Sequence, residues 1–247
     1  MPRADQLLVE AGLAASRTAA QRLIGAGRVR WAGTPVAKPA QDLPSAADLT
    51  VEADPADRYV SRGGLKLAGA LAASGVAVAG RVGLDVGQST GGFTDCLLQA
   101  GAARVVGVDV GHGQLHPRLR DDGRVAWIEG VNCRALAAAD LGEDRPAGGF
   151  DLIVADVSFI SLTLVLPQLP ALLKEGGDML LLVKPQFEVG PQGLAKGGIV
   201  RDPGLYAEVE AKLRQAAAEA GLTVQGWFDS PITGGDGNRE FFIWLRQ

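Results

Sequence analysis

Short apolar runs alternate with helical stretches from residue 81 to residue 247. Each run is an almost continuous series of apolar residues, as expected for a strand that is covered on both faces of a sheet. Seven such strands are predicted: RVGLDVG (81–87), RVVGVDV (104–110), RVAWIEG (124–130), FDLIVADV (150–157), DMLLLVKPQ (178–186), LTVQGWF (222–228) and REFFIWLR (239–246). Helical stretches lie between most of them, such as 93–99 and 206–220. The alternation predicts an α/β fold in which helices cover both faces of a mostly parallel sheet.

The last two strands are joined differently from the others. Between them lies DSPITGGDGN, which has no helical pattern. A connection without a helix favours a hairpin-like return, because parallel neighbours need a long crossover. We therefore predict that the seventh strand runs antiparallel to the rest of the sheet.

The first 58 residues have another pattern. Apolar positions at helical spacing predict two short helices, and Ser16 is a suitable N-cap for the second, over 17–24. RVRW (28–31), a turn at Ala32-Gly33 and TPV then predict a small hairpin. The polar segment DPADRY follows and reads as a linker. These features predict a small α+β domain over 1–58 and a larger α/β domain over 59–247.

Composition and charge limit the classes of partner and the cellular compartment that are expected. The chain has 247 residues and a formal net charge of −4, so a nucleic-acid partner would need a local basic patch. Such a patch is indicated between Ala11 and Gln41, where five basic residues occur without an acidic one. The two cysteines are far apart and lack metal-ligand spacing, which favours a reducing cytoplasm. With no apolar run of 18 residues, the protein is expected to be soluble.

A glycine-rich loop follows the first strand of the larger domain, in DVGQSTGGFTD (85–95). Glycines let the backbone turn sharply and approach a ligand closely. Asp109 ends the next strand, where an acid commonly binds ribose hydroxyls. A dinucleotide site would have Gly-x-Gly-x-x-Gly. Here the carboxylate of Asp85 at the mouth of the loop favours a cationic ligand such as S-adenosylmethionine.

This loop resembles the first motif of Rossmann-like methyltransferases of the FtsJ type. The resemblance implies S-adenosylmethionine as the cofactor, bound by a seven-stranded methyltransferase sheet. It also implies which residues bind each part. By this resemblance, Asp109 binds the ribose and Asn132 contacts the adenine side. The methionine end is bound by Asp85, Gly87, Ser89, Gly91, Gly92 and Phe93.

Polar residues are expected together at the carboxyl edge of the sheet, where ligands of open α/β sheets bind. Asp156 and Lys184 end two of the strands, and Glu240 begins the antiparallel one. Lys66 lies on a helix ahead of the first strand. A lysine fully inside the sheet would be costly unless it were paired, so Lys184 at a strand end points to chemistry above the edge. Together these residues resemble the Lys-Asp-Lys-Glu tetrad of 2′-O-ribose methyltransferases.

That chemistry suits a ribose hydroxyl. A weakly acidic hydroxyl needs a base to attack a methyl sulfonium, and desolvation beside another cation lowers the pKa of a lysine toward neutrality. We expect Lys184 to be the base, with Asp156 and Glu240 tuning it and Lys66 positioning the hydroxyl. Carbon-5 methylation of a pyrimidine would need a cysteine near the fourth or fifth strand end, and exocyclic-amine methylation an Asn/Asp-Pro-Pro-Tyr stretch. Neither is present.

The N-terminal pattern resembles the S4 RNA-binding module, from Arg-x-Asp through Ser-Arg to Ile-x-x-Gly-x-Val ahead of the hairpin. In that family a basic face of the second helix and the hairpin grip structured RNA. The resemblance makes six residues candidate RNA contacts: Arg3, Ser16, Arg17, Arg22, Arg28 and Lys38.

Across nearly its whole length the chain resembles the TlyA family, also named hemolysin A. Besides the S4 pattern, YVSRGGLKL, DVGHGQL, ADVSFIS, VKPQFEVG and KGGIVRD carry the likeness. The family implies 2′-O-methylation of cytidine in ribosomal RNA, on free RNA or on ribosomal subunits, without a membrane or an obligate protein partner. Two alternatives are a membrane-lytic hemolysin and a non-catalytic S4-type assembly factor. The lack of a spanning or long basic amphipathic segment disfavours the first, and the complete tetrad disfavours the second.

Overall fold

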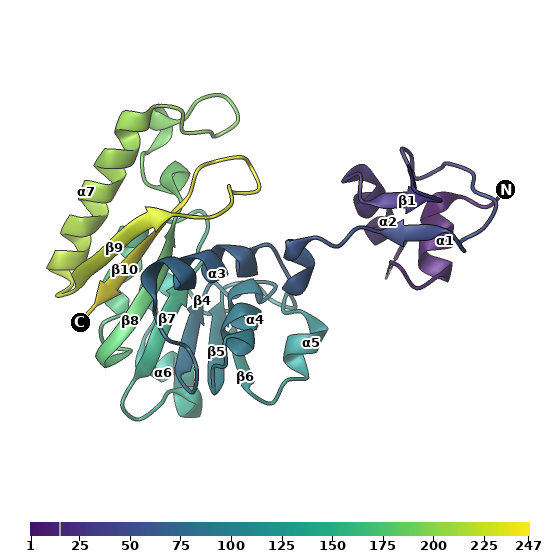
Figure 1. The fold of residues 1–247 in the computed structure, drawn as a ribbon. Coiled ribbons are helices and arrows are strands. Elements are labelled where there is room, and N and C mark those ends of the chain that lie inside the picture. The colour runs from purple at the N-terminus through teal and green to yellow at the C-terminus, as the bar shows by residue number, and fades with distance from the viewer. Residues whose placement is uncertain (15) are drawn as a thin grey trace. The chain divides into compact units, whose positions relative to one another are not determined.

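The structure, a computed structural model, describes residues 1–14 and 16–247. Within them the chain divides into two compact units, Met1–Asp57 and Arg58–Gln247 (Figure 1). A 3-10 helix, η1 (Pro55–Arg58), spans the division between them. No helix in the part of the chain that the structure describes is long and apolar enough to cross a bilayer.

The first unit is a small α+β fold with its own apolar core. Its elements are α1 (Ala4–Glu10), α2 (Arg17–Gly25), β1 (Val29–Trp31), β2 (Thr34–Pro35) and β3 (Leu49–Val51). The oxygen of Ser16 accepts a hydrogen bond from the Ala19 amide, 3.2 Å away, so this serine caps α2 as predicted. The turn between β1 and β2 has positive φ at both Ala32 and Gly33, as a tight hairpin requires.

One strand of this unit was not expected from the sequence. β3 pairs antiparallel with β1, so the sheet has the order β2-β1-β3. It has only three residues, which is too few to show an alternation of apolar and polar positions. Its pairing partner is chosen by tertiary packing, because Leu49 is buried in the same core as Leu8 and Ile24.

The second unit has the predicted α/β architecture. Its strands are β4 (Val82–Val86), β5 (Arg104–Asp109), β6 (Val125–Glu129), β7 (Phe150–Ala155), β8 (Leu173–Val183), β9 (Thr223–Asp229) and β10 (Phe241–Arg246). Its α-helices are α3 (Gly63–Ser74), α4 (Gly92–Gln99), α5 (Pro117–Arg120), α6 (Ala138–Leu141) and α7 (Pro203–Glu219). Short 3-10 helices lie in the connections: η2 (Cys133–Ala135), η3 (Gly142–Asp144), η4 (Leu162–Leu164), η5 (Leu166–Gln168), η6 (Pro185–Phe187) and η7 (Pro191–Gly193).

The seven strands form one sheet in the order β6-β5-β4-β7-β8-β10-β9. β10 is inserted between β8 and β9 and is antiparallel to both, which confirms the prediction for the last strand. The strand predicted from residue 178 begins earlier, at Leu173, and its pairing with β7 is irregular near its start. The irregularity lies in the polar segment KEGG, where Gly176 has a φ of +71° and the pairing with β7 passes from Leu173 to Asp178.

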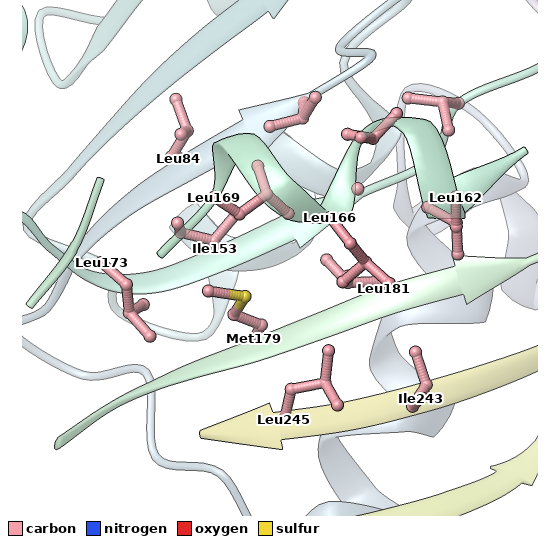
Figure 2. Close-up of a cluster of buried hydrophobic side chains, with 14 of the residues drawn as sticks. Leu84, Ile153, Leu162, Leu166, Leu169, Leu173, Met179, Leu181, Ile243 and Leu245 are labelled. Carbon is pink, nitrogen blue, oxygen red and sulfur yellow. The ribbon is translucent and has the colours of Figure 1, made fainter. Parts of the chain in front are cut away.

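Alternate residues of the strands enter two separate cores, one on each face of the sheet. Met179, Leu181 and Val183 of β8 pack on the face that η4, η5 and α7 cover. Leu180 and Leu182 point to the other face, with α3 and α4. Figure 2 shows part of the first core, including side chains of β8, β10 and η5. The sheet is therefore buried on both sides, and the space for a ligand lies at its edge.

Removal of a core side chain tests this arrangement. Leu181 is fully buried in β8, so Leu181→Ala is expected to lower the free energy of unfolding by about 2–5 kcal/mol. Urea unfolding followed by tryptophan fluorescence measures the change. The control is Leu164→Ala, because that side chain is 44% exposed and its loss should cost under about 1 kcal/mol. Equal losses for the two variants would contradict the burial of β8.

Candidate active site

The ends of β7 and β8 bring a lysine and an aspartate together. Lys184 Nζ lies 2.6 Å from Asp156 Oδ1, and it donates a hydrogen bond of 2.7 Å to Ser158 Oγ. Pro185 follows immediately and begins η6, so β8 cannot continue beyond the lysine. Lys184 is held at the sheet edge with only 11% of its side chain exposed.

A second ion pair lies at the same edge. Lys66 Nζ of α3 is 2.5 Å from Glu240 Oε2, and only 10% and 2% of the two side chains are exposed. Glu240 immediately precedes β10, whose antiparallel direction places its first residues beside the last residues of β8. Burial raises the pKa of the Glu240 carboxyl, and the hydrogen bond from Lys66 opposes that effect.

The two pairs adjoin one cavity of about 310 Å³. Lys66, Asp156 and Lys184 line it, and Glu240 reaches it through its contact with Lys66. The structure thus brings together all four residues that the sequence places at the edge. The two lysines and the two carboxylates balance in charge. The attraction within each pair therefore offsets part of the free-energy cost of removing the charges from water.

A second cavity, of about 450 Å³, adjoins the first. The two share Gly87, Ser89 and Asp156 among their lining residues. Asp109 and Asn132 line only the second. Joined cavities of this size suit an elongated ligand whose two ends have different chemistry.

Backbone groups fix the Asp109 carboxylate in the second cavity. Its Oδ2 accepts from the Ser89 amide at 2.8 Å and its Oδ1 from the Gly111 amide at 2.7 Å. The side-chain oxygen of Asn132 accepts from the Arg134 amide, which caps η2. Both side chains are therefore held in place without a ligand.

The glycine-rich loop has little room for side chains. Gly87 has φ +83°, and a Cβ there would lie 2.7 Å from the carbonyl oxygen of Asp156. Gly91 has φ +94°, and a Cβ there would lie 2.3 Å from Leu119. Gly92 and Phe93, which begin α4, line the first cavity together with Ser89. The missing side chain of Gly87 lets the residue after β4 pass close to the residue after β7.

Asp85 lies beneath this loop and does not line either cavity. It is fully buried, and its Oδ2 accepts hydrogen bonds from the Thr94 amide (3.0 Å) and hydroxyl (2.7 Å). Its Oδ1 has no hydrogen-bond partner among residues 1–14 and 16–247. Burial is the main cause that raises the pKa of Asp85 to about 7. A buried acceptor without a donor is what a cationic ligand group would satisfy.

Two polar residues at the site were not predicted from the sequence. Ser158 lines both cavities and contacts Lys184, although it lies only two residues beyond Asp156 in ADVSF. Gln88 is buried and donates to the Thr94 hydroxyl at 2.8 Å. Polar residues so close to a motif carry no pattern of their own, so only the backbone path reveals them.

In the first unit, acidic residues from outside the basic window pair with several of the arginines. Asp5 contacts both Arg3 (3.0 Å) and Arg17 (3.2 Å), and these arginines hold the pKa of its carboxyl well below the usual range. Arg28 pairs with Asp57, which leaves 16% of its side chain exposed. The free positive charge is therefore smaller than the sequence window indicates.

Two of the candidate RNA contacts remain unpaired. Arg22 and Lys38 are exposed, and neither forms an ion pair within the described part of the chain. Ser16 serves as the cap of α2. Arg22 and Lys38 are thus the candidate RNA contacts whose positive charge is not already paired with a carboxylate of the described chain.

Comparison with known proteins agrees with this architecture. Residues 59–247 match the FtsJ-like methyltransferase family and residues 2–47 match the S4 domain. The 16S/23S rRNA (cytidine-2′-O)-methyltransferase TlyA of Mycobacterium tuberculosis is 49% identical over 244 residues, which cover 99% of this chain and 89% of that protein. The chain belongs to the TlyA family. The prediction of that family from sequence is confirmed.

Other members of the family have different names. The 23S rRNA (cytidine-2′-O)-methyltransferase TlyA of Campylobacter jejuni is 36% identical over 188 residues, covering 75% of this chain and 70% of that protein. A solved structure of a proposed hemolysin from Streptococcus thermophilus superimposes with a TM-score of 0.77 at 41% identity. It covers 100% of this chain and 88% of that one. The TlyA fold is thus found under both names.

The buried carboxyl of Asp85 makes the stability of this TlyA chain depend on pH. Below about pH 4 the carboxyl is protonated in both folded and unfolded chains. Between pH 4 and 7 the unfolded chain releases this proton while the folded one keeps it, so stability falls by about 1.4 kcal/mol per pH unit. Asp85→Asn keeps an acceptor for Thr94 and has no proton to release. Its advantage in unfolding free energy over the parent should grow by about 3 kcal/mol from pH 5 to pH 8.

Urea unfolding of the parent and of Asp85→Asn at the two pH values measures this difference. Asp121→Asn, which replaces an exposed carboxylate, is the control and should track the parent at both. If the advantage of Asp85→Asn were the same at pH 5 and pH 8, Asp85 would be ionised in the folded chain.

Proposed function

We propose that this chain transfers the methyl group of S-adenosylmethionine to the ribose 2′-hydroxyl of a cytidine in ribosomal RNA. The main support is the presence of two lysine–carboxylate ion pairs beside one cavity. We take cytidine in ribosomal RNA as the substrate from the names of the M. tuberculosis and C. jejuni relatives. Such a substrate implies a cytoplasmic reaction.

The second cavity and the glycine-rich loop fit the methyl donor. The methionine end would lie where Gly87, Ser89 and the start of α4 leave space, and Asp85 would act on its ammonium from beneath the loop, since this carboxylate lines neither cavity. Asp109 would bind the ribose hydroxyls, and Asn132 would contact the adenine. When bound, S-adenosylmethionine supplies an electrophilic methyl group on a sulfonium.

The first cavity fits the acceptor nucleotide. Lys184, in its neutral form, takes the proton of the 2′-hydroxyl as the oxygen forms its bond to the methyl carbon. The bond between that carbon and sulfur breaks, and its electron pair stays on sulfur. Asp156 holds the lysine and stabilises the proton that it receives, while Lys66, fixed by Glu240, orients the hydroxyl.

We assign capture of the RNA to the first unit. Its fold and the S4 match of residues 2–47 support this assignment. Arg22 and Lys38 would contact phosphates directly, whereas Arg3, Arg17 and Arg28 would do so from positions fixed by their carboxylate partners. Phosphate contacts position an RNA substrate without reading its sequence.

Loss of the base tests the catalytic assignment. Lys184→Met keeps the length and apolar stem of the side chain but has no proton acceptor, so methyl transfer should fall about 10²–10⁴-fold. Transfer of tritiated methyl groups to ribosomal subunits lacking the modification is the measurement. Calorimetry should give nearly unchanged binding of S-adenosylmethionine.

The control for this test is Lys174→Met, which removes a lysine paired with Asp151. It should retain the parental rate. Equal rates for Lys184→Met and the parent would remove Lys184 from the mechanism. Mapping 2′-O-methyl groups in cells with and without the protein would identify the nucleotide.

The RNA assignment makes a separate prediction. Arg22→Ala and Lys38→Ala should each weaken RNA binding and reduce the slope of log affinity against log salt by about 1, because each removes one phosphate contact. Filter binding at several salt concentrations measures both effects. Arg124→Ala, which breaks a contact with Asp122, is the control and should leave the slope unchanged. A slope unchanged by the first two variants would place the RNA elsewhere.

A further inference from the structure

Lys184 has two oxygen partners, and the sequence pointed to only one of them. Its Nζ lies 2.6 Å from Asp156 Oδ1 and 2.7 Å from Ser158 Oγ. Ser158 lies in the loop after β7, is exposed, and lines both cavities. Since a lysine ammonium has donors only, the serine oxygen accepts this hydrogen bond.

The number of partners decides where the lone pair of the amine points. A neutral amine has two hydrogens and one lone pair in three staggered directions. With the Asp156 carboxylate alone, which forms an ion pair with Lys184 but whose Oδ1 accepts no hydrogen bond from the described residues, one hydrogen is drawn toward the carboxylate and the lone pair can take either remaining direction. When the Ser158 oxygen accepts the other hydrogen, the lone pair is left with the third direction. This direction is the one left for a substrate hydroxyl in the cavity that Lys184 lines.

We propose that Ser158 is a positioning residue that accepts one hydrogen of Lys184 and so directs the lone pair of the amine at the substrate hydroxyl. The inference rests on the proposed function, in which Lys184 is the base. It adds a residue outside the four charged ones and a role that none of those can fill. Glu240 and Lys66 form an ion pair with one another, and Asp156 is an ion-pair partner of Lys184 whose Oδ1 accepts no hydrogen bond from it.

The role has a signature in the pH dependence of kcat. The charged groups around Lys184 are Asp156, which follows β7, Glu240, which precedes β10, and Lys66 and Arg62, which line the same cavity. All of them remain when Ser158 is changed. A hydroxyl that accepts from an ammonium favours the protonated form, so its removal lets the amine lose its proton at lower pH. The rising limb of the profile should move to lower pH although the plateau falls.

The experiment compares Ser158→Ala, Ser158→Thr and the parent by single-turnover methyl transfer across pH 5.5 to 9. For Ser158→Ala we expect a plateau about tenfold to a hundredfold lower and a half-maximal pH about one unit lower. Binding of S-adenosylmethionine and of RNA should be unchanged. Ser158→Thr keeps the hydroxyl and should restore most of the rate and the original pH profile.

Ser161→Ala is the matched control from the same loop. Its hydroxyl donates to Glu188 and not to Lys184, and Leu162 and Lys212 also hold that glutamate. It should keep the parental profile. Parental kinetics in Ser158→Ala would overturn the inference, as would an equal loss at every pH that threonine does not restore. Full activity in Lys184→Met would instead remove Lys184 as the base of the proposed function.

Discussion

The pairing of β10 with β8 is the constraint on which the site depends. Phe241 lies opposite Val183, so the residues just beyond this pair, Glu240 and Lys184, meet at one edge although 56 positions separate them in the chain. Because side chains alternate between the faces of a sheet, a slip of one residue would turn every side chain of β10 to the wrong face. Two different cores on the two faces oppose that slip. Hydrophobic packing thereby sets the geometry of a polar site.

Charge balance is the second constraint. Four ionisable side chains are largely removed from water, and each lysine has a carboxylate within 2.6 Å. Removal of one partner from such a pair leaves a charge without compensation, which destabilises a protein more than loss of the whole pair. Substitutions in the site therefore affect the fold as well as the chemistry.

The strands and the convergence of the four charged residues could be predicted from the sequence, because apolar runs and strand ends have strong patterns. The sequence was insufficient where tertiary contacts decide. β3 is too short to have a pattern, and β8 begins ahead of the polar segment KEGG. The sequence also could not show that Asp85 is buried beneath its loop, or that Asp57 pairs with Arg28. Such pairings follow from the path of the backbone and not from spacing.

The shared carboxylate of Asp5 has a consequence for encounter with a polyanion. Arg3 and Arg17 are both anchored on it, although 39% and 53% of their side chains remain exposed. Long side chains lose rotamer freedom when they are immobilised. Here much of that freedom is already absent in the unbound chain, so the entropy lost on association is smaller. Two basic side chains of the first unit are thus partly ordered before any polyanion binds.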